Sequence, residues 1–201
     1  AKTYEGAAKS IDETLGKMEL NYIDLMLIHS PQPWAEWRED KRYFEENIQV
    51  WKALEDAYTA GKIKAIGVSN FLIDDLDNLL THCEIKPMVN QLLIHIGNTP
   101  AELIAYCKEQ NIVVEAYSPI AHGEALKNET IVAMAQKYGV SVPKLCIKYV
   151  LNLGMVALPK TANIEHMQDN ANLSFEISSE DMEFLKALDF KDYGEYSYFP
   201  V

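Results

Sequence analysis

The sequence predicts an α/β fold built from parallel strand–helix units, and three observations support this prediction. Short, β-branched apolar runs recur along the 201 residues. Segments with helical periodicity separate these runs, so strands and helices alternate along the chain. Each apolar run also ends on a polar or aromatic residue that can take part in chemistry, which is typical of the strand ends of a (β/α) barrel active site.

The strand predictions rest on continuous apolar runs, which are typical of strands that are buried on both faces. The runs and the residues that follow them are 23–28 with His29, 63–68 with Ser69 and Asn70, 88–90 with Gln91, 112–116 with Tyr117 and Ser118, and 155–159 with Lys160. Strict alternation of strands and helices at this spacing predicts a parallel sheet with right-handed crossovers.

The helix predictions rest on apolar spacing and on capping residues. Apolar residues recur at helical spacing from Phe44 to Tyr58, and Gly61 follows as a helix stop. Ser141 before Pro143 opens a later helix. The predicted helices cover residues 5–19, 43–60, 72–82, 100–110, 129–138, 142–153, 163–171 and 179–189.

The number of predicted strands falls short of a closed barrel. A (β/α)8 TIM barrel has eight strands and roughly 250 residues, whereas five apolar runs are visible in these 201 residues and the chain opens on a helix. We therefore expect the chain to carry about the last five βα units of a (β/α)8 TIM barrel, after roughly three units, on the order of 90 residues, that precede it. An independent five-stranded open sheet is the alternative, although it would expose its edge strands.

Composition and charge exclude several classes of partner. The net charge of −12 argues against nucleic acid or an anionic membrane surface as the main partner. No apolar run approaches the roughly 18–20 residues that span a bilayer, and nothing resembles a signal peptide. The three cysteines and the histidines show no metal-ligand spacing. We therefore expect a reduced, cytoplasmic protein, a monomer or weak oligomer, with no metal.

The first three strand ends carry hydrogen-bonding side chains. An imidazole at His29 can donate a hydrogen bond to a substrate carbonyl or act as an acid or base, although a lone histidine is more often structural. Ser69, Asn70 and Gln91 offer donors and acceptors that suit a ligand carboxamide. As bare polar residues, they can equally cap the helix that starts near Leu72.

The later strand ends suit a ring and an anion. Tyr117 offers a flat face for a heteroaromatic ring. Lys160 and Thr161 precede a helix that begins near Asn163, and the last strand of a β/α barrel commonly leads to a phosphate-binding helix N-terminus. A solvated surface lysine is the alternative. The loop 30–43, rich in Pro, Trp and charge, is either an active-site lid or a surface loop.

Taken together, these segments resemble the aldo-keto reductase family, in the family's order and over almost the entire chain. The matching segments are residues 23–31, 61–71, 89–91, 115–119 and 158–161. The resemblance implies an oxidoreductase that reduces small aldehydes or ketones to alcohols by hydride transfer, with NADPH as the cofactor and NADH as the alternative. It also implies that residues 1–201 form a single domain, the C-terminal portion of the family's barrel.

The resemblance implies a role for each strand end. His29 matches the catalytic histidine, which orients the carbonyl oxygen. Ser69, Asn70 and Gln91 match the groups that hold the nicotinamide carboxamide. Tyr117 matches the ring that stacks on the nicotinamide.

The remaining matches concern the phosphates and the adenosine of the cofactor. Ser118 and the backbone near Ile120 fall where the pyrophosphate lies in the family. Lys160 and Thr161 match the grip on the adenosine 2′-phosphate. The adenine contacts are matched by Asp169 and Asn170.

Two departures from the family pattern matter. His166 stands where the family usually has an arginine, and its conditional charge predicts a weaker preference for NADPH over NADH. The family's proton-donor tyrosine, with its lysine and aspartate, has no match in this chain, and Tyr22 is not a substitute in position. We therefore expect no turnover by the 201-residue chain alone. A non-catalytic, nucleotide-binding regulatory or channel-associated subunit of the same fold is the alternative function.

Overall fold

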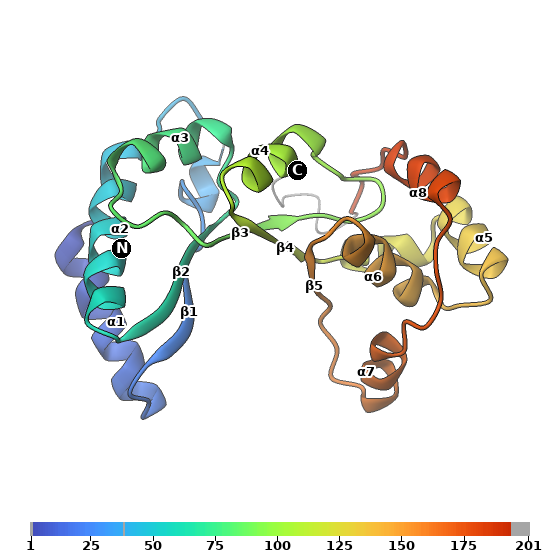
Figure 1. Ribbon diagram of the computed structural model, residues 1–201, viewed down its shortest axis with the longest axis horizontal. Helices are drawn as coiled ribbons and strands as arrows, with labels where there is room; N and C mark the ends of the chain where they lie inside the picture. The colour runs from blue at the N-terminus through green and yellow to red at the C-terminus, as the bar shows by residue number, and fades with distance from the viewer. Residues whose placement is uncertain (1, 38, 194–201) are drawn as a thin grey trace. The chain divides into compact units, whose positions relative to one another are not determined.

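Strands and helices alternate along the chain, as the sequence predicts (Figure 1). The structure is a computed structural model that describes residues 2–37 and 39–193. The strands are β1 (Ile23–Ile28), β2 (Ile63–Ser69), β3 (Val89–Leu93), β4 (Val113–Tyr117) and β5 (Val156–Leu158). Gln91 lies inside β3 rather than after it, because β2 and β3 remain paired through Ser69 and Gln91.

The predicted helices are confirmed, with ends that differ by a few residues at most. They are α1 (Tyr4–Met18), α2 (Phe44–Thr59), α3 (Ile73–His82), α4 (Ala101–Glu109), α5 (Glu129–Lys137), α6 (Val142–Asn152), α7 (Ile164–Ala171) and α8 (Ser179–Lys186). Ser141 caps α6 by accepting a hydrogen bond from the Lys144 amide, as its place before Pro143 predicts. Two 3-10 helices that were not predicted, η1 (Trp34–Glu36) and η2 (Ala121–Leu126), lie in loops.

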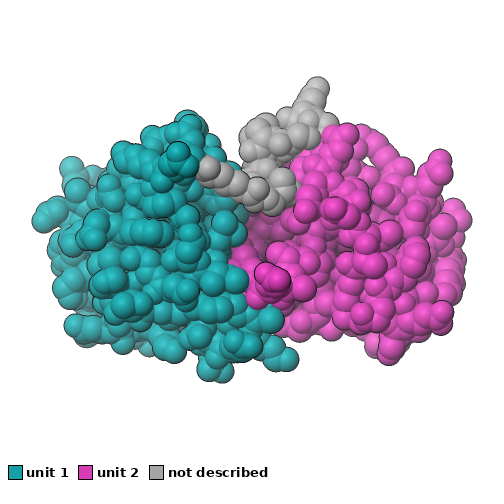
Figure 2. Space-filling view, turned by 90° about the horizontal axis from the view of Figure 1, so that it is seen from above, with its two compact units in different colours: residues 1–91, 105–113 teal, residues 92–104, 114–201 magenta. Residues whose placement is uncertain are grey.

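The internal contacts of the chain divide it into two compact units (Figure 2). Unit 1 comprises Ala1–Gln91 and Ala105–Val113, and unit 2 comprises Leu92–Ile104 and Val114–Val201. The expectation of a single domain over residues 1–201 stays a prediction.

Unit 1 is built on the parallel pairs β1–β2 and β2–β3. The helices α1 and α2 lie side by side, and α2 packs on β1 and β2 (Figure 1). Trp51 of α2 is almost completely buried, and its indole nitrogen donates to the Ile85 carbonyl at 3.0 Å. The buried Glu55 carboxylate accepts the amides of Glu84 and Ile85, each at 2.7 Å. These bonds tie the connection from α3 to β3 to the buried face of α2.

Gly67 lies between two neighbouring strands that both come close to it. It pairs with Leu27 in β1 and with Val89 in β3. A Cβ atom at this position would lie 2.7 Å from Leu27 Cδ2 and 2.7 Å from the Val89 carbonyl oxygen. Glycine is therefore required because a neighbouring backbone, which cannot move aside cheaply, occupies the space.

Unit 2 is built around the parallel pair β4–β5 and the helices that follow it. The buried helix faces supply its core, with Ile131 from α5 and Leu145, Tyr149 and Val150 from α6. The Tyr149 hydroxyl lies 2.8 Å from the hydroxyl of Thr99. On the outer side, Lys137 of α5 donates to both carboxylate oxygens of Asp181 on α8 at 2.8 Å.

The expectation that every strand is buried on both faces is wrong for the outer strands. None of the six residues of β1 is buried, and in β5 Val156 and Leu158 are 43% and 36% exposed. Within the described residues, β1 pairs with β2 and β5 pairs with β4. Each outer strand is therefore shielded from solvent by a neighbouring strand along one edge. By contrast, most of β2 is buried.

Over the part of the chain that the structure describes, no helix combines the length and the apolar character that crossing a membrane requires.

We expect Gly67→Ala to destabilise unit 1 by about 1–3 kcal/mol, because the added methyl group overlaps the Val89 carbonyl. Gly16→Ala is the matched control. Gly16 lies in α1 with open space around its Cβ position, so alanine should stabilise the helix by about 0.5–1 kcal/mol. Urea unfolding of both variants measures the difference, and equal stability of the two variants would contradict the close approach at Gly67.

Candidate functional site

The ends of β1 and β2 and the middle of β3 form a hydrogen-bonded row in unit 1. Asn70 Nδ2 donates to the His29 carbonyl at 3.1 Å and to Ser69 Oγ at 2.9 Å. The backbone amide of Asn70 and the hydroxyl of Ser69 both donate to the Gln91 carbonyl, each at 2.9 Å. The four residues that the sequence singles out here are therefore brought together.

Asn70 adopts a conformation that few residue types tolerate. Its φ is 62°, in the left-handed region, which Asn enters more readily than most side chains because its short amide can bond locally. This turn directs the amide nitrogen back toward His29 and Ser69. Ser69 and Asn70 are both buried, so their polar groups have been taken out of water and paired.

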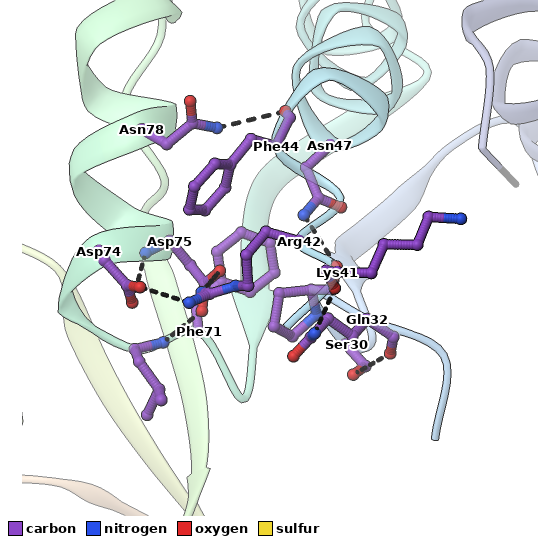
Figure 3. Close-up of polar contacts among 12 residues, drawn as sticks. Ser30, Gln32, Lys41, Arg42, Phe44, Asn47, Phe71, Asp74, Asp75 and Asn78 are labelled. Atoms are coloured by element: carbon purple, nitrogen blue, oxygen red, sulfur yellow. Dashed lines mark hydrogen bonds and ion pairs between the residues drawn. The ribbon is translucent and has the colours of Figure 1, made fainter. Parts of the chain in front are cut away.

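The alternative that these residues cap the following helix is wrong. Leu72 is the N-cap residue of α3, and its amide donates to Asp75 Oδ2 at 3.1 Å. Asp75 is buried and also accepts a hydrogen bond from Arg42, which bonds Asp74 as well (Figure 3). The carboxylate from the first turn of α3 therefore caps the helix, while the amide of Asn70 is used between strand ends. The role of Ser69, Asn70 and Gln91 toward a carboxamide stays a prediction.

His29 is the first residue after β1, and its ring is exposed. The ring centroid lies 5.5 Å from that of Trp34, with the planes 74° apart. The hydrogen bond from Asn70 to its carbonyl fixes the backbone at this position. The imidazole is thus held at a strand end where it can meet a ligand, and its proposed catalytic role stays a prediction.

A cavity of about 670 Å³ in unit 2 brings together most of the later candidates. Seven of the residues that the sequence analysis assigns to cofactor binding line it: Ser118, Ile120, Lys160, Thr161, His166, Asp169 and Asn170. They come from the loop after β4, the loop after β5 and α7. A single cavity of this size can bury much of a nucleotide-sized ligand.

Other residues that line the cavity have no signal in the sequence for such a role, among them His122, Gly123 and Ser141. His122 and Gly123 lie in η2, where φ is positive at both residues. Only the glycine gave a local signal for such a turn. Ser141 was interpreted as a helix cap, and its place in the cavity depends on the packing of α6 against α7.

The N-terminus of α7 forms one wall of the cavity. The side-chain oxygen of Asn163 caps the helix by accepting a hydrogen bond from the backbone amide of Glu165 at 2.8 Å. The backbone amide of Asn163 donates to Thr161 Oγ1 at 3.1 Å. Lys160 precedes this turn. A helix N-terminus with a lysine and a hydroxyl beside it favours an anion, because the helix dipole and the ammonium group attract negative charge.

Asp169 of α7 has partners of its own within the protein. Its carboxylate accepts from Ser141 Oγ at 2.7 Å and lies 3.3 Å from Lys144 Nζ. The hydrogen bond from Ser141, followed by the bond from Lys144, lowers the pKa of Asp169. The carboxylate is therefore ionised at neutral pH and ties α7 to α6. An adenine contact from the same residue stays a prediction.

Tyr117 is the last residue of β4 and directly precedes Ser118, but it is not one of the residues that line the cavity. Burial raises the pKa of its phenol, so the side chain is neutral at physiological pH. A neutral, partly buried ring suits stacking rather than proton transfer.

The structure also contains a buried histidine cluster that the sequence does not predict. His95 Nε2 lies 2.7 Å from the Tyr193 hydroxyl, and His95 Nδ1 lies 2.6 Å from the Ile96 carbonyl. Because a carbonyl can only accept, Nδ1 carries the proton and Nε2 accepts from Tyr193. The Tyr193 ring also stands edge-on to His122, a cavity residue, at 5.5 Å. Partners 98 residues apart leave no local signal.

Among the described residues, no group of three or more His, Cys, Asp and Glu side chains is arranged to hold a metal ion.

Comparisons with known proteins agree on one family. The sequence model of the aldo/keto reductase family matches residues 1–189. Glyoxal reductase of Bacillus subtilis (strain 168) is 40% identical to the chain over 186 residues, which are 92% of this chain and 63% of that protein. The chain spans 62% to 65% of the length of three curated relatives that are 38% to 40% identical to it.

Solved structures give the same result for the fold. MGS-M4, an aldo-keto reductase enzyme from a Medee basin deep-sea metagenome library, superposes with a TM-score of 0.84 at 31% identity, over 94% of this chain and 67% of that chain. The silkworm Bombyx mori aldo-keto reductase AKR2E5, complexed with NADPH, has a TM-score of 0.81 at 30% identity, over 94% and 61% of the two chains. These matches confirm the predicted fold class, α/β with five strand–helix units of a (β/α)8 barrel.

We expect the stability of the protein to fall as the pH falls from about 6.5 to 4. Burial lowers the pKa of His95 to about 4 from an ordinary value of 6.5. The unfolded chain therefore binds a proton in this window that the folded protein does not, so stability present above pH 6.5 is lost as the pH drops. The loss is on the order of 3 kcal/mol.

Urea unfolding at several pH values measures this effect. His95→Gln should flatten the dependence between pH 6.5 and 4, whereas His82→Gln, at an exposed position on α3, should leave it unchanged. An unchanged slope in His95→Gln would show that His95 is not held neutral.

Proposed function

This chain belongs to the aldo/keto reductase family, and from that membership we propose that the protein reduces aldehydes or ketones to alcohols with NADPH. The observation that carries the proposal is the cavity in unit 2, where Lys160, Thr161 and the N-terminus of α7 meet. That donor set suits a phosphate group, and the cavity volume suits a nucleotide. NADPH, when bound, would supply the hydride for the carbonyl carbon.

The matches to the family give each candidate residue a part in the proposal. In unit 2, Lys160 and Thr161 would hold the 2′-phosphate, Ser118 and the backbone at Ile120 the pyrophosphate, and Asp169 and Asn170 the adenine. Tyr117 would stack on the nicotinamide ring. In unit 1, the row of Ser69, Asn70 and Gln91 would hold the carboxamide.

His29 would act on the substrate itself. A nitrogen of its exposed ring would donate a hydrogen bond to the carbonyl oxygen, which orients the carbonyl and draws charge from its carbon. The proposal assigns the proton donor to no residue of this chain, because the 201 residues contain no tyrosine, lysine and aspartate in the family's context.

The named relatives do not favour the alternative of a regulatory subunit, since the matched proteins with a named activity are reductases. One of them is a glyoxal reductase, so a small dicarbonyl compound is a suitable first substrate to test. The cytoplasmic location and the monomeric or weakly oligomeric state stay predictions.

Direct binding of NADPH tests the proposal. We expect the protein to bind NADPH in a fluorescence titration, and Lys160→Met to weaken that binding at least tenfold while changing NADH binding less than threefold, because only NADPH carries the 2′-phosphate. Lys127→Met is the control, since Lys127 pairs with Glu124 on the surface. Equal loss for both nucleotides would contradict the assignment of Lys160.

Carbonyl-dependent oxidation of NADPH tests the activity. We expect it in the protein as the cell makes it, with glyoxal as the first substrate, and not in the 201-residue chain alone. His29→Gln should lower the rate at least tenfold with unchanged NADPH binding. Turnover by the 201-residue chain would overturn the assignment of the proton donor outside it.

The position of His166 predicts a modest cofactor preference. A histidine supplies a smaller ring and a conditional charge where an arginine would supply a permanent one. We expect His166→Arg to increase the preference for NADPH over NADH several-fold. The ratio of the two dissociation constants measures it, and a preference of about a thousandfold in the unaltered protein, roughly 4 kcal/mol, would refute the weakened preference.

A further inference from the structure

We infer that Trp34 determines substrate specificity: its indole forms a fixed aromatic wall beside His29 and favours carbonyl compounds whose carbonyl carries a flat, aromatic substituent. This inference rests on the proposed function, because it takes His29 as the residue that meets the carbonyl oxygen. It concerns a residue that the sequence analysis placed only in a loop.

The position of the ring carries the inference. Trp34 stands edge-on to His29, with 5.5 Å between the ring centroids. It remains 42% exposed, although tryptophan buries more apolar area than any other side chain when it is packed. A large aromatic surface is therefore held open to solvent in contact with the imidazole. A substrate that brings its carbonyl to His29 would bring the neighbouring substituent to this surface.

A second tryptophan supports the first. The ring of Trp37 lies 5.5 Å from that of Trp34, with the planes tilted by 34°. Trp37 is less exposed than Trp34. Contact with His29 on one side and Trp37 on the other limits the rotation of the Trp34 indole, so a ligand that stacks on it meets a pre-ordered surface.

The loop that bears Trp34 is closed by hydrogen bonds at its base (Figure 3). The buried Gln32 donates through Nε2 to the carbonyls of Glu39 and Lys41 at 3.1 and 2.7 Å. Ser30 Oγ donates to the Gln32 carbonyl at 2.6 Å, and Asn47 Nδ2 of α2 donates to the Pro31 carbonyl at 3.0 Å. The buried side-chain amide of Gln32 thus joins the two ends of the segment that contains η1.

The end of the loop is anchored to α3 by charge (Figure 3). Arg42 uses two different nitrogens to bond Asp74 and Asp75 in the first turn of that helix. Asp75 is only 3% exposed, so the pair is partly shielded from water. With both ends held, the segment that bears Trp34 acts as a fixed wall beside His29 rather than as a lid that closes.

The chemistry of the wall sets the class of substrate. An indole face attracts flat, polarisable groups by offset stacking or edge contact, and a benzene ring on the carbonyl carbon would reach it while the oxygen faces His29. A short aliphatic chain has too little area to gain from the same contact. The preference therefore concerns the ratio of rates for aromatic and aliphatic aldehydes.

Steady-state kinetics of the protein as the cell makes it test the inference. We expect Trp34→Ala to lower kcat/KM for benzaldehyde about tenfold and kcat/KM for butanal less than twofold. Trp34→Phe keeps an aromatic face and should retain most of the benzaldehyde rate. An equal loss for both aldehydes, or no loss for either, would overturn the inference while leaving the proposed reductase activity intact.

Ligand binding provides a readout that needs no turnover and no cofactor. The chain contains three tryptophans, and Trp51 is buried. Benzaldehyde should quench the fluorescence of the unaltered protein, and the saturable part of this quenching should disappear in Trp34→Ala, which removes the aromatic face, but persist in Trp51→Phe. Persistence of that quenching in Trp34→Ala would overturn the inference even if the protein proved to reduce no carbonyl compound.

Discussion

The hydrogen bonds of one amide, Asn70, hold the candidate site in unit 1 together. Through its side chain and its backbone, Asn70 joins the end of β1 at His29 to β3 at Gln91, with Ser69 bonded to both Asn70 and Gln91. Parallel strands leave their carboxyl ends unpaired at one edge, and buried polar groups there must find partners. The same bonds that satisfy the strand ends therefore set the place of the imidazole that is proposed to meet the substrate.

In unit 2, loops and helix contacts, rather than hydrogen bonds between strand ends, position the candidate residues. Its cavity is lined by loops and by one face of α7, and the position of α7 depends on the bond from Ser141 to Asp169. The protein has 30 acidic and 18 basic residues, and its net charge is −12. Attraction for a phosphate must then come from local groups, namely Lys160 and the helix N-terminus, rather than from the overall field.

The two proposals use the same division between rigid strands and variable loops. As proposed, the strand ends would supply the groups that the reaction class needs, whereas the loop after β1 would supply the aromatic surface that selects among substrates. That loop is held by the amide of Gln32 and by Arg42. The residue proposed for the reaction that the family shares thus lies next to the residue proposed for a substrate preference particular to this protein.

Local patterns in the sequence suffice to predict the order of the strands and helices, because periodicity and caps such as Ser141 are local properties. The sequence also singled out His29, Lys160 and the other strand-end residues as candidates, since a parallel α/β chain brings strand ends to one edge. The tertiary structure was needed to show that Asp75, rather than Ser69 or Asn70, caps α3. It alone paired His95 with Tyr193 and placed Trp34 against His29. Such contacts depend on how loops and distant segments pack, and residue spacing carries no record of that packing.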